Sequence, residues 1–444
     1  MDIQIEDVRC FSGRHSIPLR PITIIVGENS TGKSTFLAIL AALSNLYNNP
    51  LHPLFGDSPY DLGSYDSICS FDFEAGQPKN QFGIGLNNEV KVGEKLTQVK
   101  AMAFYGGSYG QAVLRKLEIA TGDNEMVLEI SGNQVTTRVG FIKSGEAQRT
   151  TMSYTGQLSK GYAPLFAVAI GAITNSLDKL EKPKGKDESP KKMMFSIDSM
   201  VESIAGLQAA FGSVHSLAPI RTKPSRTYDR FDDEFRPEGE HVPATLRHVF
   251  LDANMAESRT RLMTAITEFG KDSGLYEDVE PVALNEKRMD SPFQVMIKLG
   301  DQKFNLVDVG YGVSQSLPIV VQAALEGSGG MVLLQQPEVH LHPRAQAALG
   351  SFFVKVARES NVQFVIETHS DYLVDRVRQE IAKNTLAPEK VAILFFEKRG
   401  DRVEVHNIEL DKLGNVVKAP ASYRAFFLEE EINLLSRGNV SCVS

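Results

Sequence analysis

"ITIIVGENSTGKST", residues 22–35, is the stretch that decides the fold. Its apolar start, "ITIIV", is typical of a buried strand, and the helical run "KSTFLAILAALSNLYN" begins at its lysine. Between them, "GENSTGKS" matches GxxxxGK[ST], and a strand before and a helix after are the context that this pattern requires. A chance glycine-rich turn is the alternative, but it does not account for this framing. The sequence therefore predicts a phosphate-binding loop.

Each residue type in this loop has a predicted role. Gly27 and Gly32 let the backbone turn so that successive N–H groups face phosphate oxygens, at the positive end of the next helix. Lys33 is expected to reach the β and γ phosphates, and the Ser34 hydroxyl to bind magnesium. We therefore expect a nucleoside triphosphate and Mg²⁺ as cofactors, with the nucleotide held by Gly27, Glu28, Asn29, Ser30, Thr31, Gly32, Lys33, Ser34 and Thr35.

The rest of the chain predicts strands and helices around the loop. Residues 2–26 alternate apolar and polar positions, which indicates short strands, and residues 82–142 have the period of two that is typical of an antiparallel meander. Helical patterns cover about 160–180 and 195–212, on either side of a charged, solvated loop. From residue 292 onward strands and helices alternate, which predicts parallel βαβ units: "FQVMIKL", "SLPIVVQAALE", "MVLLQ", "RAQAALGSFFVKVARE", "VQFVIETHS" and "DYLVDRVRQEIA".

Composition excludes several classes of protein. With 444 residues, 42% of them hydrophobic, the chain can bury a large core in two or three domains, or in one domain with insertions. Three scattered cysteines, Cys10, Cys69 and Cys442, form no CxxC pair, so we expect no disulfide framework and a cytoplasmic location. The start of the chain does not resemble a secretory signal, and the most apolar stretch, 163–173, is too short to span a bilayer. We therefore expect no membrane association, and the net charge of -8 argues against a broadly basic surface for DNA.

Two further segments have features of phosphate-facing elements. "DVGYGVSQSLPI", 308–319, is a loop that leads into a helix, with Ser314 as the expected N-cap and Pro318 in the first turn. "VQFVIETHS" ends in Thr368, His369 and Ser370, which places an imidazole at the carboxyl edge of a strand, where α/β sheets bind ligands. The plainer alternatives are a helix cap in the first case and a structural histidine in the second.

Taken together, these motifs resemble those of ABC-type ATPases of the OLD/RecF/SMC-like group, which many bacterial anti-phage systems contain. The similarity covers about 1–70 and 290–400 and is weaker at 216–246, and it is to the stand-alone Septu, PARIS and retron-associated type. Those ATPases have no Toprim domain, and residues after His369 contain no DxD motif. The motifs are "ITIIVGENSTGKST", "DVGYGVSQSLPI", "LLQQPEVHLHPRAQ" and "FVIETHSDYLVDRV".

The resemblance implies an α/β fold: a P-loop NTPase with an ABC-type head, in which helices flank a mixed central sheet. An antiparallel β meander and a helical segment are inserted. The implied parts are 1–80 and 291–444 for the head, 81–160 for the β-rich insertion and 161–290 for the helical region. Two heads would sandwich two ATP molecules, with Ser314 and Gln315 of one subunit pressing on the γ-phosphate held by the other. His369 would be the switch histidine that contacts this phosphate.

Two glutamines occupy positions where this family has acids. In "LLQQPE", Gln335 stands where an acid helps to hold magnesium through water, and Gln336 where a second acid often activates the attacking water. A glutamine can hydrogen-bond a water but cannot accept its proton, and loss of a general base costs about 10²- to 10⁴-fold in rate. We therefore expect binding of Mg²⁺ and ATP with slow turnover. Gln336 is within the family pattern. Gln335 is either native or a Glu→Gln replacement that traps the ATP-bound dimer, and Glu338 is the nearest acid that could substitute in part.

His340 and His342, with Glu338, have the spacing of a metal site, but the sequence places no further ligand. In the ABC-type ATPases that this chain resembles, the segment crosses the dimer interface. We favour this role over a metal site.

Three functions remain open. The first is a homodimeric, ATP-gated regulator of an effector, a nuclease of the HNH or Toprim type, in anti-phage defence. The second is a RecF-like clamp that binds nucleic acid in DNA repair, for which the evidence is the stretch with Arg221, Lys223, Arg226, Tyr228 and Arg230. The third is a scaffold that uses ATP only structurally. A salt-dependent gel shift with duplex DNA separates the second from the first.

Overall fold

The computed structural model describes most of the chain. The described residues are 1–46, 55–56, 59–92, 95–122, 124–132, 134–142, 149–157, 202, 206, 212–229, 232–285, 287–288, 290–400 and 402–423. The helices expected at 160–212 lie almost wholly outside these ranges, as does Arg230. None of the helices in the described ranges is both long and apolar enough to cross a membrane.

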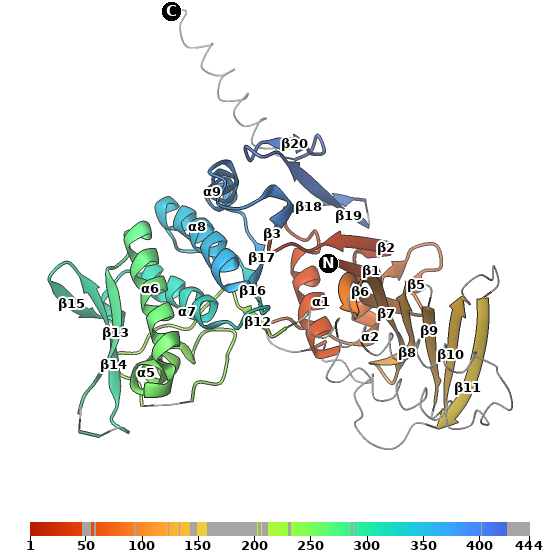
Figure 1. Ribbon diagram of the computed structural model, residues 1–444, viewed down its shortest axis with the longest axis horizontal. Helices are drawn as coiled ribbons and strands as arrows, with labels where there is room; N and C mark the ends of the chain where they lie inside the picture. The colour runs from red at the N-terminus through yellow and green to blue at the C-terminus, as the bar shows by residue number, and fades with distance from the viewer. Residues whose placement is uncertain are drawn as a thin grey trace, which may run out of the picture.

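A seven-stranded mixed sheet forms the centre of the molecule (Figure 1). Five neighbouring strands are parallel, in the order β12-β16-β17-β3-β18, and two antiparallel strands extend the β18 edge. The strand β3 therefore lies between two strands from the far end of the chain, so both ends build one sheet. The bounds are β3 Ile22–Gly27, β12 Val214–Leu217, β16 Met331–Gln335, β17 Gln363–Glu367, β18 Val391–Arg399, β19 Arg402–Leu410 and β20 Val416–Lys418.

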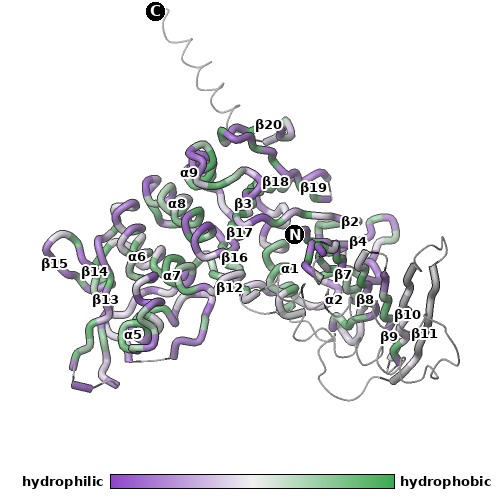
Figure 2. Tube along the Cα trace, in the orientation of Figure 1, coloured by the Kyte–Doolittle hydropathy of each residue, from purple (hydrophilic) through white to green (hydrophobic). Residues whose placement is uncertain are grey.

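The central strands separate two hydrophobic cores. Successive side chains of a strand point to opposite faces, and the strands are apolar at nearly every position, as Figure 2 shows for β16, β17 and β3. Strands buried on both faces are typical of parallel sheets. One core includes Ile25, Leu333, Val365 and Leu394. The other includes Ile24, Leu334, Ile366 and Ile393.

Helices cover both faces of this sheet. The helix that follows the phosphate loop, α1 (Lys33–Leu46), belongs to the first core, and five helices belong to the second. The five are α5 Val242–Leu251, α6 Ala256–Ser273, α7 Tyr311–Leu325, α8 Pro343–Ser360 and α9 Asp371–Ala382. The short helices are α2 Tyr65–Ile68, η1 Ala253–Met255, η2 Leu306–Asp308 and η3 Pro388–Lys390. The predicted mixed sheet flanked by helices is confirmed.

The predicted meander is also confirmed, but it is continuous with the N-terminal strands. An eight-stranded antiparallel sheet has the order β11-β10-β9-β8-β7-β6-β1-β2, and Ile5 of β1 lies opposite Ile84 of β6. The boundary expected near residue 81 therefore does not separate two sheets. The bounds are β1 Asp2–Val8, β2 Phe11–Pro18, β6 Phe82–Val92, β7 Lys95–Ser108, β8 Gln111–Thr121, β9 Asn124–Ser131, β10 Gln134–Ile142 and β11 Arg149–Gln157, with a small hairpin of β4 Phe71–Asp72 and β5 Gln77–Pro78.

One expected strand of the parallel series is placed elsewhere. "FQVMIKL" becomes β14 (Phe293–Leu299), which pairs antiparallel with β13 (Asp278–Ala283) and β15 (Gln302–Asn305) in a separate sheet. Its buried residues alternate, whereas β16 and β17 are buried at consecutive positions. This alternation indicates a strand with one exposed face, so the prediction of a parallel strand was wrong.

Candidate functional site

The phosphate loop lies at the carboxyl end of β3, and its lysine is folded into it. The Lys33 ammonium donates hydrogen bonds to the backbone oxygens of Gly27 at 3.0 Å and Glu28 at 2.5 Å. The Lys33 side chain is 4% exposed. Burial lowers the pKa of Lys33, while the carboxylates of Glu367 and Glu28 act in the opposite direction. The positive charge is therefore held where the loop would receive phosphates.

Two glycines of the loop have close neighbours as well as positive φ angles. A Cβ at Gly27 (φ +144°) would lie 2.3 Å from the backbone oxygen of Phe396 on β18. A Cβ at Gly32 (φ +85°) would lie 2.5 Å from the sulfur of Cys10. The first contact is the more restrictive, because a paired strand's carbonyl cannot move aside as a side chain can.

Replacing Gly27 by alanine is expected to lower the free energy of unfolding. Backbone strain of this kind costs about 1 to 3 kcal/mol, and the collision with Phe396 adds to it. Gly327→Ala is the control, because its Cβ meets no heavy atom within 4 Å. Thermal unfolding of both variants provides the measurement, and equal stability would show that β18 yields at this point.

The hydroxyl of Ser34 connects the loop to the ends of two neighbouring strands. The Gln335 side-chain amide donates to Ser34 Oγ at 2.7 Å, and Ser34 Oγ donates to Glu367 Oε2 at 3.0 Å. Gln335 and Glu367 are partners in the β16–β17 register, so both side chains leave their strands at the same level. Glu367 is 4% exposed. It is the carboxylate that contacts the predicted magnesium-binding hydroxyl, and the sequence motifs did not indicate it.

A cavity of about 480 Å³ opens over these residues, within the range of roughly 300–1,000 Å³ that is usual for small-molecule sites. Of the predicted loop residues, Asn29, Ser30, Gly32, Lys33, Ser34 and Thr35 line it, together with Gln335 and Gln336. The lining also includes four residues that were not predicted to belong to the site: Arg9, Cys10, Pro219 and Glu367. Arg9 and Cys10 come from the turn between β1 and β2, and Arg9 donates to Thr35 Oγ1 at 3.5 Å. Thr31 is fully buried and instead bonds the backbone of Glu28.

The segment after β16 forms a tight turn beside the switch region. Gln336 has φ +44° and donates its backbone N–H to the backbone oxygen of Glu367 at 2.8 Å. Glu338 accepts from the backbone N–H of His369 at 2.8 Å and does not line the cavity. The expectation that Glu338 could replace the missing acid is therefore not supported by its position. His369 is exposed at the carboxyl end of β17.

The helix expected to contact a partner's nucleotide begins earlier than predicted. Helix α7 starts at Tyr311 with Gly310 as its N-cap, so Ser314 lies inside the first turn, where its hydroxyl donates to the backbone oxygen of Tyr311. Pro318 is consequently in the helix interior, and it has no N–H for the carbonyl of Ser314. The prediction of Ser314 as N-cap was wrong.

The residues at the N-terminal end of α7 differ in how far they are exposed. Ser314 and Gln315 are 6% and 1% exposed, whereas Gly310 and Tyr311 are exposed. The accessible part of the predicted signature element is therefore the start of the helix, not the two side chains that the sequence selected. At its other end α7 is anchored by buried Glu326, which accepts hydrogen bonds from His215, Ser213 and Gln322. Burial alone would raise the pKa of Glu326, but these hydrogen bonds hold it below its ordinary value.

The two histidines after Glu338 have structural partners. His340 packs edge-on against Tyr311, with 4.9 Å between ring centroids. His342 is the N-cap of α8 and accepts from the backbone N–H of Arg344. Within the described ranges, the group close enough to share a metal ion is Glu397, Glu404 and His406, not these histidines. These contacts do not indicate a metal site at the two histidines, and the crossing of a dimer interface by this segment stays a prediction.

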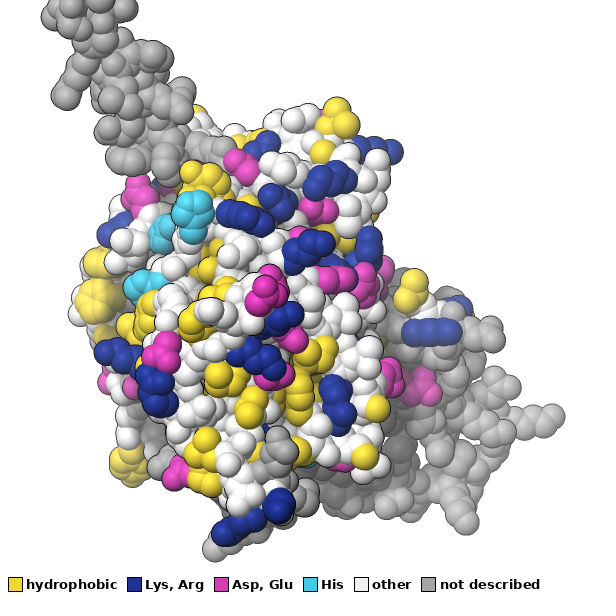
Figure 3. Space-filling view, turned by 90° about the vertical axis from the view of Figure 1, so that its left-hand side faces the viewer, with side chains coloured by type: hydrophobic (Ala, Val, Ile, Leu, Met, Phe, Trp, Pro, Cys, Tyr) yellow, Lys and Arg dark blue, Asp and Glu magenta, His cyan; other side chains and the backbone are white. Residues whose placement is uncertain are grey.

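Of the basic stretch 221–230, Arg221 is buried and Arg226 and Tyr228 have partners within the chain. Arg221 is 2% exposed, and burial lowers its pKa to about 10. Arg226 pairs with Asp308, and Tyr228 packs against Phe293. Figure 3 shows basic and acidic side chains interspersed over one face of the molecule. The described part of this stretch therefore does not form the basic strip that a DNA clamp requires.

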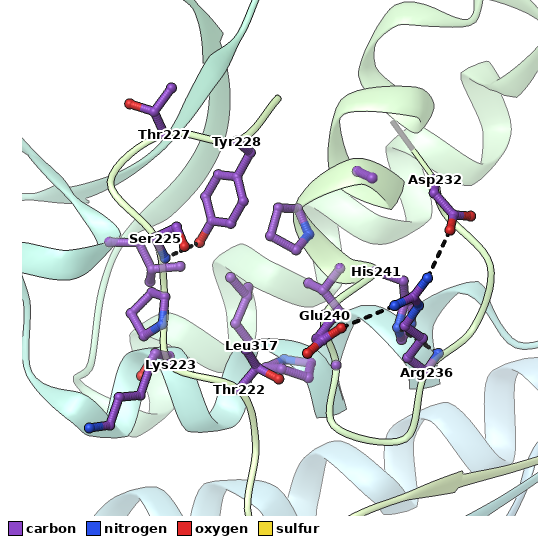
Figure 4. Close-up of a pocket in the computed structure, with 18 of the residues that line it drawn as sticks. Thr222, Lys223, Ser225, Thr227, Tyr228, Asp232, Arg236, Glu240, His241 and Leu317 are labelled. Atoms are coloured by element: carbon purple, nitrogen blue, oxygen red, sulfur yellow. Dashed lines mark hydrogen bonds and ion pairs between the residues drawn. The ribbon is translucent and has the colours of Figure 1, made fainter. Parts of the chain in front are cut away.

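A second cavity, of about 290 Å³, lies where this stretch approaches α5 and α7 (Figure 4). Ser314 lines this cavity, not the one over the phosphate loop. Arg236 at its side pairs with Asp232 and Glu240, so charges around the opening are largely matched within the chain.

The sheet, its flanking helices and the glycine loop between β3 and α1 define the fold of a P-loop ATPase, with the mixed sheet expected for an ABC-type head. Residues 179–375, less than half of the chain, match the family model described as "AAA domain, putative AbiEii toxin, Type IV TA system". A search of curated proteins found no match.

Among solved structures, an SMC head bound to the C-winged helix domain of ScpA is 12% identical and covers 93% of this chain and 98% of its own, with a TM-score of 0.46. The SMC head domain from Thermotoga maritima is 11% identical, covers 92% and 98%, and has a TM-score of 0.39. An Smc head derived from Pyrococcus furiosus, with an extended coiled coil and bound to the C-terminal domain of ScpA, is 12% identical, covers 97% and 98%, and has a TM-score of 0.39.

Proposed function

We propose that this chain binds ATP and hydrolyses it slowly, and that its ATP-bound dimer controls a partner effector. The observation that carries the proposal is the convergence of Lys33, Ser34 and the two strand ends on one cavity. The loop's N–H groups and the start of α1 favour an anion here, and Lys33 adds a charge that cannot be satisfied fully by two carbonyls.

The site's chemistry supports tight binding more than fast cleavage. The donors at Ser34 are a hydroxyl and a carboxylate, which are hard oxygen ligands of the kind that Mg²⁺ prefers. Mg²⁺ bound there would supply charge neutralisation to the phosphates. Gln335 and Gln336 can hold a water by hydrogen bonds but cannot take up its proton, so we expect the ATP-bound form to persist.

The position of the start of α7 supports the proposed dimer. Its exposed start, Gly310 and Tyr311, lies outside the cavity of its own chain, yet the first-turn N–H groups of a helix attract anions. A second copy would bring this end to the open side of the cavity. The family description names a toxin of a Type IV toxin–antitoxin system, which supports a role in defence. The effector that we propose is a nuclease, and the chain alone is expected to be inactive in a nuclease assay.

Gly310→Asp is expected to weaken ATP-dependent dimerisation while leaving nucleotide binding by one subunit unchanged. Gly310 has φ −58° and open space around its Cβ, and aspartate is a favourable N-cap, so the variant should fold. Its charge would face the partner's phosphates, and like charges across an interface cost several kcal/mol, which is roughly 100-fold in dimer affinity.

Gly327→Asp is the matched control, since Gly327 also has open space and lies beyond the other end of α7. Light scattering after gel filtration, with and without Mg²⁺ and ATP, measures the dimer. A Gly310→Asp chain that dimerises as fully as the control would show that α7 is not at the interface, and an unsubstituted chain that stays monomeric would refute the dimer.

A further inference from the structure

The Ser34 hydroxyl has one carboxylate partner in the described part of the chain, and it is not on the strand where the sequence places an acid. Ser34 Oγ lies 3.0 Å and 3.4 Å from the two carboxylate oxygens of Glu367. The residue on the expected strand, Gln335, approaches the same hydroxyl with an amide N–H. The carboxylate that contacts Ser34 therefore comes from β17, which neighbours β16, and it lies at the same level of the sheet as Gln335.

Glu367 lines the cavity from the end of a strand that is paired on both sides. Its side chain is 4% exposed but forms part of the cavity lining. Its backbone is held by Gln336, which donates to the carbonyl, and by pairing of β17 with β16 and β3. An acid here also opposes the effect of burial on Lys33. A buried carboxylate on a rigid strand end, facing a hydroxyl across an open cavity, has the donor chemistry and the position of a magnesium ligand.

Gln335 avoids a conflict of charges around Ser34. Two carboxylates on one hydroxyl would repel each other unless a cation lay between them. An amide at residue 335 instead donates to Ser34, which in turn donates to Glu367. The chain of hydrogen bonds orients both Ser34 and the carboxylate.

We propose that Glu367 is the metal-side acid of this site: with Ser34 it binds the Mg²⁺ of Mg-ATP, in the place of an acid at residue 335. The proposal rests on the proposed ATP binding. It implies that Mg²⁺ strengthens ATP binding in this chain although residue 335 is a glutamine. It also implies that this effect of Mg²⁺ depends on Glu367 at the end of β17.

The test compares ATP affinity by calorimetry in excess Mg²⁺ and in EDTA, so that it does not depend on turnover. In the unsubstituted chain Mg²⁺ should strengthen ATP binding. Glu367→Gln should lower the ratio of the ATP affinity in Mg²⁺ to the affinity in EDTA by about 10- to 100-fold. Affinity in EDTA should stay within about threefold, a change of less than 1 kcal/mol. Glu326→Gln is the matched control, because Glu326 is also 4% exposed and hydrogen-bonded but does not line the cavity.

The double variant Gln335→Glu, Glu367→Gln places one acid back on β16. It should recover the Mg²⁺ effect, and it decides the question even if Glu367→Gln alone folds poorly, because one carboxylate remains at Ser34. An Mg²⁺ effect that survives in Glu367→Gln, or that fails to return in the double variant, overturns the proposal. Absence of ATP binding in the unsubstituted chain, with or without Mg²⁺, would instead refute the proposed function.

Discussion

Gln335→Glu should raise the rate of phosphate release by about 10- to 100-fold, the usual effect of a group that holds a metal ion through water. Gln335 already lies within hydrogen-bond distance of Ser34 and lines the cavity, so glutamate of the same length would project into it. Unlike the amide, the new carboxylate carries a negative charge with which it can hold the water bound to Mg²⁺. Phosphate release at saturating Mg-ATP measures the effect, and the ATP affinity should change far less than the rate.

The same substitution should also make stability depend on the cation. Without Mg²⁺, the introduced glutamate and Glu367 would share one hydroxyl, and like charges at this distance disfavour ionisation of both. We expect a lower melting temperature in EDTA and recovery with Mg-ATP. Gln302→Glu, on the exposed strand β15, carries the same charge change and serves as control. An unchanged hydrolysis rate would favour the scaffold function, in which ATP is bound but not consumed.

Lys33→Ala should weaken ATP binding by about 100-fold or more. Hydrogen bonds to a charged group are worth about 1.5 to 3 kcal/mol each, and the Lys33 ammonium makes two of them to the loop, which phosphate oxygens would take over. Removing it eliminates both the charge and the donor. Calorimetric titration with Mg-ATP gives the dissociation constant.

Lys412→Ala is the control for loss of a lysine, because Lys412 is exposed after β19. Circular dichroism establishes that Lys33→Ala folds, since the substitution leaves the backbone oxygens of Gly27 and Glu28 without this donor. Unchanged ATP affinity in a folded Lys33→Ala chain would remove the basis of the proposed function.

Local sequence patterns predicted the phosphate loop, whereas the long-range pairing of strands determines which acid contacts Ser34. The order of strand, loop and helix around Gly27 and Lys33 is contained in fourteen consecutive letters, residues 22–35. Glu367 is 333 positions from Ser34, and they meet only because β17 lies between β16 and β3. Its adjacent letters, "ETHS", directed attention to His369 instead. One signal could have found it: the ends of neighbouring parallel strands meet at one edge.

The first residue of α7 was predicted wrongly for a different reason. Ser314 is a good N-cap by residue type, but Gly310 and the packing of Val313 and Leu317 into the second core start the helix one turn earlier. Similarly, "FQVMIKL" is apolar enough for a central strand, and only its alternation indicates the separate sheet. Propensity identified these elements, whereas tertiary packing determined their ends and their partners.

The position of β3 between β17 and β18 has a consequence for biosynthesis. The N-terminal antiparallel strands can pair with one another as soon as they leave the ribosome, but both neighbours of β3 are made more than 300 residues later. At roughly 5 to 20 residues per second, "ITIIV" waits on the order of 20 to 70 s for its partners. During translation the nascent chain therefore exposes an unpaired apolar strand, which makes it a natural client for a chaperone until its last quarter has emerged.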